Sequence, residues 1–539
     1  MELAPRLPLV RLGLQGASGC ETLGALLCEP ALAFLLCQLR RRHRPGLSKP
    51  FRLPRAATAL GSVLLLATGS ARAVDVLQIR LPLLQEDFSV RIEELASPDA
   101  LWAGRSDLAE LNRATNGAYA LRLQELLNQP MPMQDHLDTP MVHQVEVILK
   151  RLVDLPANEA NLLYSRPVRE GMQKLKAQGR KATLLSLLQA IPGHKVSIRL
   201  DRAVVFLKQI NQNNAQITEL LRTLPALAAA PSAALRRGPL AITTRVVNLP
   251  LAAGNESLEV TLVRPVGPPT LPAVVISHGL WDSPSSFLGW AQHLASHGAP
   301  VLLPRHPGSD ISQQAQMLAG NAPPPDPREF LRRPRDVKAV LDALENGLIP
   351  GAEGIPARGV IFIGHSWGGT TALQLAGARS LRAGIWKACK NTDNPERNLS
   401  WVLQCTFLPA ATVDSLADPR IVRVVAVSPP QALVFAAGLV DLQKPVLLIS
   451  GSSDIVVPAE PEALDPFHLY PLDRSQMVLV EGGTHFNLPA PADSDGGPLR
   501  ALLLHWVQGK SLKADAAVAD PAGRVLHLVP QRGPVPANR

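Results

Sequence analysis

The stretch "IFIGHSWGGTTALQL", residues 361–375, gives the strongest indication of the fold of this chain. An apolar run leads into Gly-His-Ser-Trp-Gly at positions 364–368, and a segment with helical character follows. This pattern predicts a buried strand, a sharp turn and a helix. A G-x-S-x-G sequence at such a turn holds the serine hydroxyl above the end of a sheet, where it can attack a substrate. Ser366 is therefore a candidate nucleophile, and an ordinary tight turn is the alternative.

Two later segments offer partners for this serine, each just after an expected strand. In "PVLLISGSSD" the acid Asp454 follows the run 444–450, and in "MVLVEGGTH" the base His485 follows the run 477–481. A serine hydroxyl needs a base to take its proton, and the base needs an acid to orient it. The chain order serine, acid, histidine with these strand contexts predicts a triad of Ser366, Asp454 and His485. Ordinary turn residues are the alternative for the last two.

An oxyanion hole is expected where the segment "AVVISHGL" ends at Leu280. Backbone N–H groups at such a strand end can bind the negative oxygen that forms when an acyl carbonyl is attacked. We expect the N–H groups of Leu280 and Trp367 to serve this purpose. His278 is expected to brace the loop rather than to act as a base. His306 and Asp310 are either further bracing residues or part of the pocket wall.

Residues 239–512 alternate between short β-rich runs and helical runs. Such alternation predicts right-handed crossovers and a mostly parallel sheet with helices on both faces. The first two runs are expected to pair antiparallel at one edge. The expected strands are 240–248, 258–264, 272–277, 300–303, 359–363, 421–427, 444–450 and 477–481, and the expected helices are 285–297, 327–346, 367–378 and 497–508.

The segments on either side of this region have a different character. Residues 74–224 predict a small, mainly helical domain, which begins with an extended or hairpin segment at 76–96. A Pro/Ala-rich linker is expected at 225–238 and a disordered tail at 513–539. The helices expected in the first domain are 106–128, 141–155, 167–178, 182–191 and 198–224.

Residues 1–73 are interpreted as a leader segment, and the pattern of a signal peptide lies in its second part. Basic residues precede the apolar run "AATALGSVLLLATG" at 56–69, and "SARA" then offers a cleavage site. The run is short for a transmembrane helix, so a cleaved signal peptide is favoured over an uncleaved anchor. Residues 1–45 do not fit a leader and are interpreted as a mis-assigned start. The expected location is therefore the bacterial periplasm or exterior, with a membrane-anchored form as the alternative.

The net charge of +9 does not indicate nucleic-acid binding. Residues 1–73 hold ten Lys and Arg against three Glu, so the remaining chain has 44 basic and 42 acidic residues. A basic surface is the main requirement for binding the phosphate backbone. We therefore expect no nucleic-acid partner, and membrane contact only through an uncleaved leader.

An insertion at 379–420 is longer than a helix-to-strand connection requires, and such loops are often lids. It contains both cysteines of the predicted mature chain, Cys389 and Cys405, which form either one disulfide or two unpaired thiols. The hypothesis is a cap over Ser366 that contributes to the substrate pocket, and a structural excursion is the alternative. The proposed pocket residues are Trp386, Trp401 and Phe407 from the insertion, together with Trp281.

The segments "SHGL", "RHPGSD", "GHSWGG", "SGSSD" and "GGTHF" occur in the order seen in the α/β-hydrolase superfamily, and this resemblance covers about 255–510. The chain most resembles the dienelactone-hydrolase-like and platelet-activating-factor-acetylhydrolase-like esterases. The resemblance implies an α/β-hydrolase fold with an eight-stranded, mostly parallel sheet. Residues 74–224 are similar to a domain of unknown function found in exported bacterial, chiefly cyanobacterial, hydrolases.

Two features depart from these subfamilies. Dienelactone hydrolases use a cysteine nucleophile, whereas this chain has Ser366. The acetylhydrolases take their acid after the strand that follows the nucleophile, but the segment "VAVSPPQ" at that place has no carboxylate. Asp454 must then serve as the acid, and the substrate of neither subfamily can be assigned to this chain.

The expected activity is hydrolysis of a small-molecule carboxylic ester through an acyl-enzyme intermediate, without a metal or organic cofactor. The same triad would suit a thioesterase, lipase or acyltransferase. The alternative from another class is a catalytically silent binding or scaffold protein.

Overall fold

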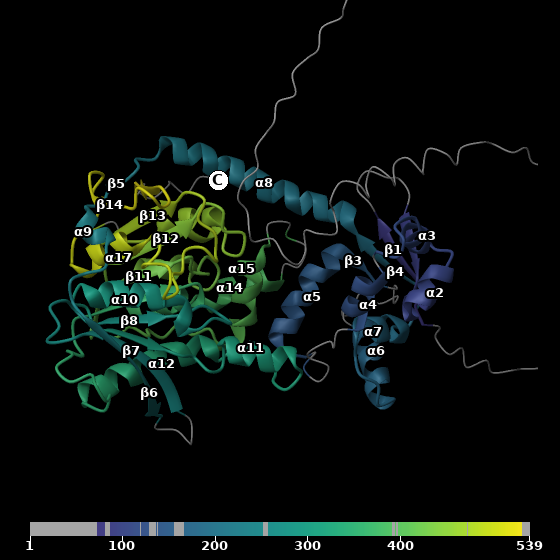
Figure 1. Ribbon diagram of the computed structural model, residues 1–539, viewed down its shortest axis with the longest axis horizontal. Helices are drawn as coiled ribbons and strands as arrows, with labels where there is room; N and C mark the ends of the chain where they lie inside the picture. The colour runs from purple at the N-terminus through teal and green to yellow at the C-terminus, as the bar shows by residue number, and fades with distance from the viewer. Residues whose placement is uncertain are drawn as a thin grey trace, which may run out of the picture. The chain divides into compact units, whose positions relative to one another are not determined.

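The computed structural model describes residues 73–530 with short gaps, which are 81–86, 119, 129–135, 137, 156–165, 252–256, 391–393, 395–396 and 472. The predicted leader, apart from its last residue, and residues 531–539 of the predicted tail lie outside the described residues. Figure 1 labels the helices and strands that are named below.

A nine-stranded sheet forms the core of the C-terminal part of the chain, in the order β15-β13-β12-β11-β10-β8-β9-β7-β6. The strands β8, β9, β10, β11, β12 and β13 run parallel to one another, and β6, β7 and β15 pair antiparallel at the two edges. The strand bounds are β6 (Ile242–Pro250), β7 (Ser257–Pro265), β8 (Val274–Ser277), β9 (Val301–Pro304), β10 (Val360–His365), β11 (Ile421–Val427), β12 (Val446–Gly451), β13 (Ser475–Val480) and β15 (Leu526–Val529).

The first eight of these strands match the predicted runs within two residues at each end. The ninth strand, β15, was not predicted, because residues 513–539 were assigned to a disordered tail. That assignment is wrong for the described part of the tail, since β15 pairs with β13 and Leu526 is fully buried. A four-residue strand whose partner lies far away in the sequence carries little local signal of its own.

Helices cover both faces of the sheet (Figure 1). Alternate side chains of β10 point to opposite faces, as the two-residue period of a strand requires. Val360 and Phe362 pack with α12 (Glu329–Glu345) and α13 (Trp367–Ala376). Ile361 and Ile363 pack with α10 (Leu288–Ser296) and α17 (Arg500–Val507). The other helices of this part are α9 (Ser232–Leu235), α11 (Ile311–Leu318), α14 (Arg382–Lys390), α15 (Leu399–Thr406) and α16 (Asp465–Phe467).

Helices make up most of the described N-terminal part, as predicted for residues 74–224, but a small sheet that was not predicted accompanies them. The sheet has four strands in the order β2-β1-β4-β3, and the expected hairpin of β1 and β2 is present in it. The strand β4 was missed because it pairs in parallel with β1, more than one hundred residues earlier in the chain. The strand bounds are β1 (Val76–Arg80), β2 (Asp87–Arg91), β3 (Val153–Asp154) and β4 (Lys195–Arg199).

Helices pack around this small sheet, and one predicted helix is divided. The stretch expected at 106–128 forms two helices, because Asn116 and Gly117 both have a positive φ, of 52° and 79°. A left-handed backbone cannot continue a right-handed helix. The helices are α2 (Pro98–Ala103), α3 (Asp107–Ala114), α4 (Ala120–Asn128), α5 (Pro140–Leu152), α6 (Arg166–Ala177), α7 (Leu184–Ala190) and α8 (Leu200–Thr223).

The predicted boundary at 224–225 and the linker after it are also corrected. Near the end of α8, Ile217 and Leu221 pack against Ala459 and Leu479, so this helix shares an apolar cluster with the nine-stranded sheet. Within the expected linker, β5 (Ala228–Ala229) pairs with β14 (Ala517–Ala519). The segment after α8 is therefore part of the packed structure rather than a free connection.

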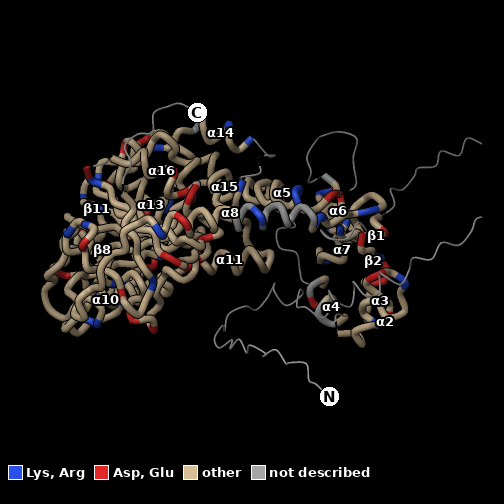
Figure 2. Tube along the Cα trace, turned by 90° about the horizontal axis from the view of Figure 1, so that it is seen from above, with Lys and Arg blue, Asp and Glu red and all other residues tan. Residues whose placement is uncertain are grey.

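Positions of basic and acidic residues are interspersed along the described chain (Figure 2). This distribution agrees with the near balance of acidic and basic residues after residue 73. A search of the helices in the described residues for a long, apolar, membrane-spanning segment found none.

Candidate active site

Ser366 stands at a sharp turn between β10 and α13. Its φ of 54° and ψ of −122° lie outside the regions that a residue with a side chain usually adopts. The turn is tight enough to require the glycines on both sides. A Cβ atom at position 364 would lie 2.0 Å from the carbonyl oxygen of Gly368, and one at position 368 would lie 2.2 Å from that of Ser277. The predicted strand, turn and helix are therefore present, and the turn is strained at the serine.

A chain of hydrogen bonds connects the three residues predicted as a triad. The Oγ atom of Ser366 lies 2.9 Å from Nε2 of His485, and Nδ1 of this histidine lies 2.8 Å from Oδ2 of Asp454. An ionised carboxylate can only accept, so Nδ1 carries the proton and Nε2 can accept from the serine hydroxyl. All three residues are buried, with 5%, 7% and 4% of the residue surface exposed for the serine, the histidine and the aspartate.

The acid of this set is itself held by the backbone. Oδ1 of Asp454 accepts hydrogen bonds from the N–H groups of Val456 and Val457, at 2.9 and 2.8 Å. These donors fix the carboxylate so that its other oxygen faces the imidazole. The turn after β12 therefore orients Asp454, and Asp454 in turn orients His485.

Two backbone donors are available beside the serine. Trp367 is the first residue of α13, and the first N–H groups of a helix have no partner within it. Among the hydrogen bonds of the described residues, none uses the N–H of Leu280 or of Trp367. The loop before Leu280 lies directly against Ser366, because a Cβ atom on Gly279 would be 3.0 Å from that of the serine. This arrangement suits the stabilisation of an oxyanion.

A cavity of about 330 Å³ opens onto the serine and the histidine. Trp281, predicted as a pocket residue, is part of its wall. The backbone of Trp281 is strained, with a φ of 58°, and its indole donates to Oε1 of Gln313 at 2.9 Å. The wall is made by Gly279, Leu280, Trp281, Asp282, Ser286, His365, Ser366, His485, Phe486, Pro489 and Pro491.

The three aromatic residues predicted to line the pocket from the insertion do not belong to this wall. Trp386 is 55% exposed, and the ammonium of Lys390 lies 4.7 Å from its ring. Phe407 is buried, and its ring stacks on Trp367 with 4.2 Å between centroids. Trp401 lies on α15, where its backbone N–H donates to Oδ1 of Asn398. Phe407 thus packs behind the nucleophile turn, in the core, and the prediction for these three residues is corrected.

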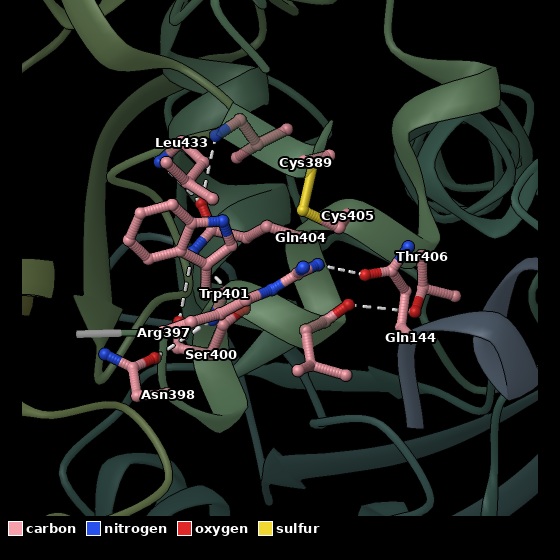
Figure 3. Close-up of a disulfide and its surroundings, with 12 residues drawn as sticks. Gln144, Cys389, Arg397, Asn398, Ser400, Trp401, Gln404, Cys405, Thr406 and Leu433 are labelled. Atoms are coloured by element: carbon pink, nitrogen blue, oxygen red, sulfur yellow. Dashed lines mark hydrogen bonds between the residues drawn. A yellow bond between two sulfur atoms is a disulfide. The ribbon is translucent and has the colours of Figure 1, made fainter. Parts of the chain in front are cut away.

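The insertion is anchored to its surroundings. Cys389 on α14 and Cys405 on α15 form a disulfide (Figure 3). Beside it, Oε1 of Gln404 accepts from the N–H groups of Leu433 and Val434, at 2.8 and 2.9 Å.

A second contact leads from the insertion to the N-terminal part. The guanidinium of Arg397 donates to Oε1 of Gln144 on α5 (Figure 3). The insertion therefore contacts both the N-terminal part and the segment after β11.

A buried polar network lies behind the oxyanion loop. Nε2 of His278 accepts from the backbone N–H of His306 at 3.0 Å, so its Nδ1–H donates to the carbonyl oxygen of Gly279 at 2.7 Å. Burial, together with the positive charge of Arg333, lowers the pKa of His278 well below its usual value and keeps the ring neutral. This contact fits the bracing role expected for His278.

His306, one of the two residues left open by the sequence, belongs to the same network, and Asp310, the other one, has separate partners. Nδ1 of His306 lies 2.8 Å from Oδ2 of Asp336, and both side chains are buried. Asp310 accepts from the N–H of Gln313 and so caps α11. Neither His306 nor Asp310 belongs to the cavity wall, which leaves bracing as their role.

Several wall residues were not predicted from the sequence. Phe486 follows the predicted base directly, and its position in "GGTHF" was the one available signal. His365 is 3% exposed, its ring lies 4.7 Å from the ring of His485, and neither of its nitrogens has a hydrogen-bond partner among the described residues. Burial lowers the pKa of His365 well below its usual value, so this ring is neutral. Pro489 and Pro491 had no recognisable signal.

Comparison with known families agrees with this geometry. Residues 274–533 match the model of a family described as "Alpha/beta hydrolase family". The mostly parallel sheet, the helices on its two faces and the serine turn after β10 together define the α/β-hydrolase fold for this part of the chain. A search of curated protein sequences found no match to the chain.

Proposed function

We propose that this protein is a serine hydrolase that cleaves carboxylic esters through an acyl-enzyme intermediate. The observation that carries the proposal is the unbroken hydrogen-bond chain from Ser366 through His485 to Asp454, at 2.9 and 2.8 Å. A hydroxyl is a weak nucleophile at neutral pH, and a positioned imidazole activates it by accepting its proton. The cavity gives a substrate carbonyl access to this hydroxyl.

The reaction would proceed in two halves. Oγ of Ser366 attacks the carbonyl carbon while Nε2 of His485 takes the hydroxyl proton, and Asp454 stabilises the resulting imidazolium. The negative oxygen of the tetrahedral intermediate accepts from the N–H groups of Leu280 and Trp367. The intermediate then expels the alcohol, which receives the proton from Nε2. In the second half, a water molecule gives a proton to His485 and attacks the acyl-serine, which releases the carboxylic acid and restores the hydroxyl.

The cavity wall favours an uncharged acyl group. Among the described residues that form it, none is lysine or arginine, and Asp282 adds a carboxylate. Leu280, Trp281 and Phe486 present apolar surface instead. A carboxylate on the substrate would lose its hydration without gaining a cationic partner. The volume of about 330 Å³ is at the small end of the range for ligand pockets, which suits a short acyl chain.

The proposed relationship to the dienelactone-hydrolase-like and platelet-activating-factor-acetylhydrolase-like esterases rests on particular segments. "SHGL" supplies Leu280, "GHSWGG" supplies Ser366 and "GGTHF" supplies His485. The acid follows β12 rather than β11, so we do not infer the substrate of this chain from these esterases.

Ester turnover tests the proposal. Purified residues 74–539 and a Ser366→Ala variant are assayed with p-nitrophenyl acetate, butyrate and hemisuccinate. We expect hydrolysis of the acetate and butyrate, weaker hydrolysis of the negatively charged hemisuccinate, and a decrease in kcat of about 10⁴- to 10⁶-fold in the variant. Turnover that survives in the variant would reject Ser366 as the nucleophile. A folded wild-type protein that hydrolyses none of the esters would favour a binding protein.

We also propose that the protein is exported. The leader-like segment before Val74 supports this, and so does the disulfide, because disulfides persist in oxidising compartments. Mass spectrometry of the native protein should find an N-terminus at Val74. Peptides from residues 1–40 in the native protein would contradict the proposed processing.

A further inference from the structure

We propose that Arg333 is a positioning residue that holds the peptide between Gly279 and Leu280 so that the N–H of Leu280 faces the oxyanion. This inference rests on the proposed function, because an oxyanion forms only if Ser366 attacks a carbonyl. Arg333 lies on α12, outside every segment that the sequence motifs singled out.

The guanidinium of Arg333 is fully buried and binds the oxyanion loop at two successive carbonyl groups. Nη1 donates to the oxygen of His278 at 2.5 Å, and Nη2 donates to the oxygen of Gly279 at 2.9 Å. Its Nε donates to Oγ of Ser309 at 3.0 Å. These contacts use the planar fork of the guanidinium, which a single ammonium group could not reproduce.

The carbonyl oxygen of Gly279 and the N–H of Leu280 belong to one peptide group. A trans peptide is planar, and its C=O and N–H bonds point in opposite directions. Two donors hold the oxygen, Nη2 of Arg333 and Nδ1 of His278 at 2.7 Å. Fixing the oxygen on the buried side therefore fixes the N–H on the opposite side of the peptide. The positive charge of the guanidinium beside this oxygen also polarises the peptide group and strengthens its N–H as a donor.

The same side chain also holds the far end of the loop. The carbonyl oxygen of Ser309 accepts from the N–H of Trp281 at 2.7 Å, and the hydroxyl of Ser309 accepts from Nε of Arg333. Arg333 thus fixes the backbone both before and after Leu280.

The surroundings keep the guanidinium charged and in place. Burial lowers the pKa of Arg333 to about 10, which still leaves it protonated at neutral pH. The carboxylates of Glu329 and Asp336 lie close enough to favour the charged form. The hydroxyl of Ser309 donates to Oε2 of Glu329 at 2.7 Å, so this acid also supports the contact to Nε.

The test compares Arg333→Lys and Arg333→Met with the wild-type protein, using residues 74–539. Arg420→Met is the matched control, because Arg420 is also buried and ion-paired, but lies before β11, away from the carboxyl ends of the strands. We measure kcat and KM for p-nitrophenyl butyrate. We also measure the affinity for an alkyl trifluoromethyl ketone, which forms an oxyanion on a serine nucleophile, and for butyrate, which does not.

Removal of one oxyanion donor typically lowers kcat by about 10²- to 10³-fold. A donor that is present but poorly directed should have a smaller effect. We expect Arg333→Met to lower kcat by about 10- to 100-fold while KM stays within about twofold. The affinity for the ketone should fall by a similar factor, and the affinity for butyrate should not change. Arg333→Lys keeps the charge and should fold more readily, and we expect its kcat to be about 10-fold lower than that of the wild type. Arg420→Met should lower stability but keep kcat.

Unchanged kcat and ketone affinity in folded Arg333→Lys would overturn the proposal. So would parallel losses for the ketone and butyrate, or an equal loss of kcat in the Arg420→Met control, since these indicate a general structural effect. A wild-type protein that neither turns over esters nor binds the ketone would instead reject the proposed function, and the role of Arg333 with it.

Discussion

The backbone of Ser366 has a positive φ, and this local strain depends on its neighbours. Gly364 lets β10 approach α13, and Gly368 lets α13 approach the end of β8, so closely that a methyl group at either position would overlap a carbonyl oxygen. Gly279 lets the loop that carries the Leu280 N–H lie directly against the Cβ of Ser366. The reactive geometry is thus maintained by residues that have no functional group of their own.

The substitution Gly364→Ala tests this packing. The new Cβ would meet a backbone oxygen at 2.0 Å, which cannot move as the end of a side chain can. We expect a loss of about 1–3 kcal/mol in the free energy of unfolding and a decrease in kcat of about 100-fold, because the serine is displaced. Urea unfolding and p-nitrophenyl butyrate hydrolysis measure the two effects.

Gly384→Ala is the control for that substitution. Gly384 lies on α14, is exposed, and has no atom within 4 Å of an added Cβ. Alanine favours a helix over glycine by up to about 1 kcal/mol, so this variant should be at least as stable as the wild type and fully active. A Gly364→Ala protein that behaves like this control would contradict the account of the turn.

At this scale, the sequence predicted the residues that lie in short local patterns. Ser366, Asp454 and His485 each follow a strand, so their contexts could be recognised one by one. Arg333 and Pro491 could not be found in this way. Their roles depend on contacts with segments far away in the chain, and neither residue lies in a recognisable motif.

Among the elements, the insertion shows most clearly what a linear pattern leaves open. Its length and aromatic residues suggested a cap whose side chains line the pocket. In the structure, α14 and α15 are joined by the disulfide, and Phe407 packs against Trp367 behind the nucleophile turn. An aromatic residue in a long insertion suits a pocket and a core equally well, and only its packing decides between them.

The double substitution Cys389→Ser and Cys405→Ser tests the role of this insertion. Loss of a cross-link that closes a loop of this length should lower the free energy of unfolding by about 3 kcal/mol. Since no residue of the insertion belongs to the described cavity wall, kcat/KM for p-nitrophenyl acetate should stay within about twofold. A large loss of activity at unchanged stability would show instead that the insertion shapes the site.

Two strands with distant partners were also not predicted from the sequence. The β4 strand pairs with β1, and β15 pairs with β13. Each is short, so its own residues show little periodicity, and its stability comes from the neighbouring strand. The eight longer or centrally buried runs were predictable because their apolar residues stand out locally.

At the scale of the whole molecule, buried acids make the stability of the fold depend on pH. Burial raises the pKa of Asp336 to about 7 and also raises the pKa values of Glu329 and Glu462. Asp336 lies next to His306 in the network behind the oxyanion loop. In the unfolded chain the pKa of this acid returns to about 4. The folded protein therefore binds a proton that the unfolded chain releases between about pH 4 and pH 7.

Asp336→Asn should make stability less dependent on pH. The stability that comes from protonated Asp336 is fully present below about pH 4 and is lost as the pH rises through about 7. Urea unfolding at pH 5 and pH 8 should thus show a larger decrease in the free energy of unfolding for the wild type than for the variant. Equal decreases in both proteins would contradict the raised pKa.

The division of the whole chain was only partly predictable. The alternation of strands and helices after residue 239 indicated the fold class, because each element carries its own periodicity. The packing of Ile217 and Leu221 onto the nine-stranded sheet was not visible, since an apolar face shows that a helix is covered but not by what. A boundary that follows composition can therefore separate segments that pack together.

The measurement that tests the central claim most directly is labelling by a fluorophosphonate. The purified protein, residues 74–539, is treated with the probe, its intact mass is measured, and the modified peptide is sequenced. The account predicts one adduct per chain on Ser366, and none on a folded Ser366→Ala variant. A folded wild-type protein that stays unlabelled, or an adduct that persists in the variant, would contradict the claim that Ser366 is an activated nucleophile.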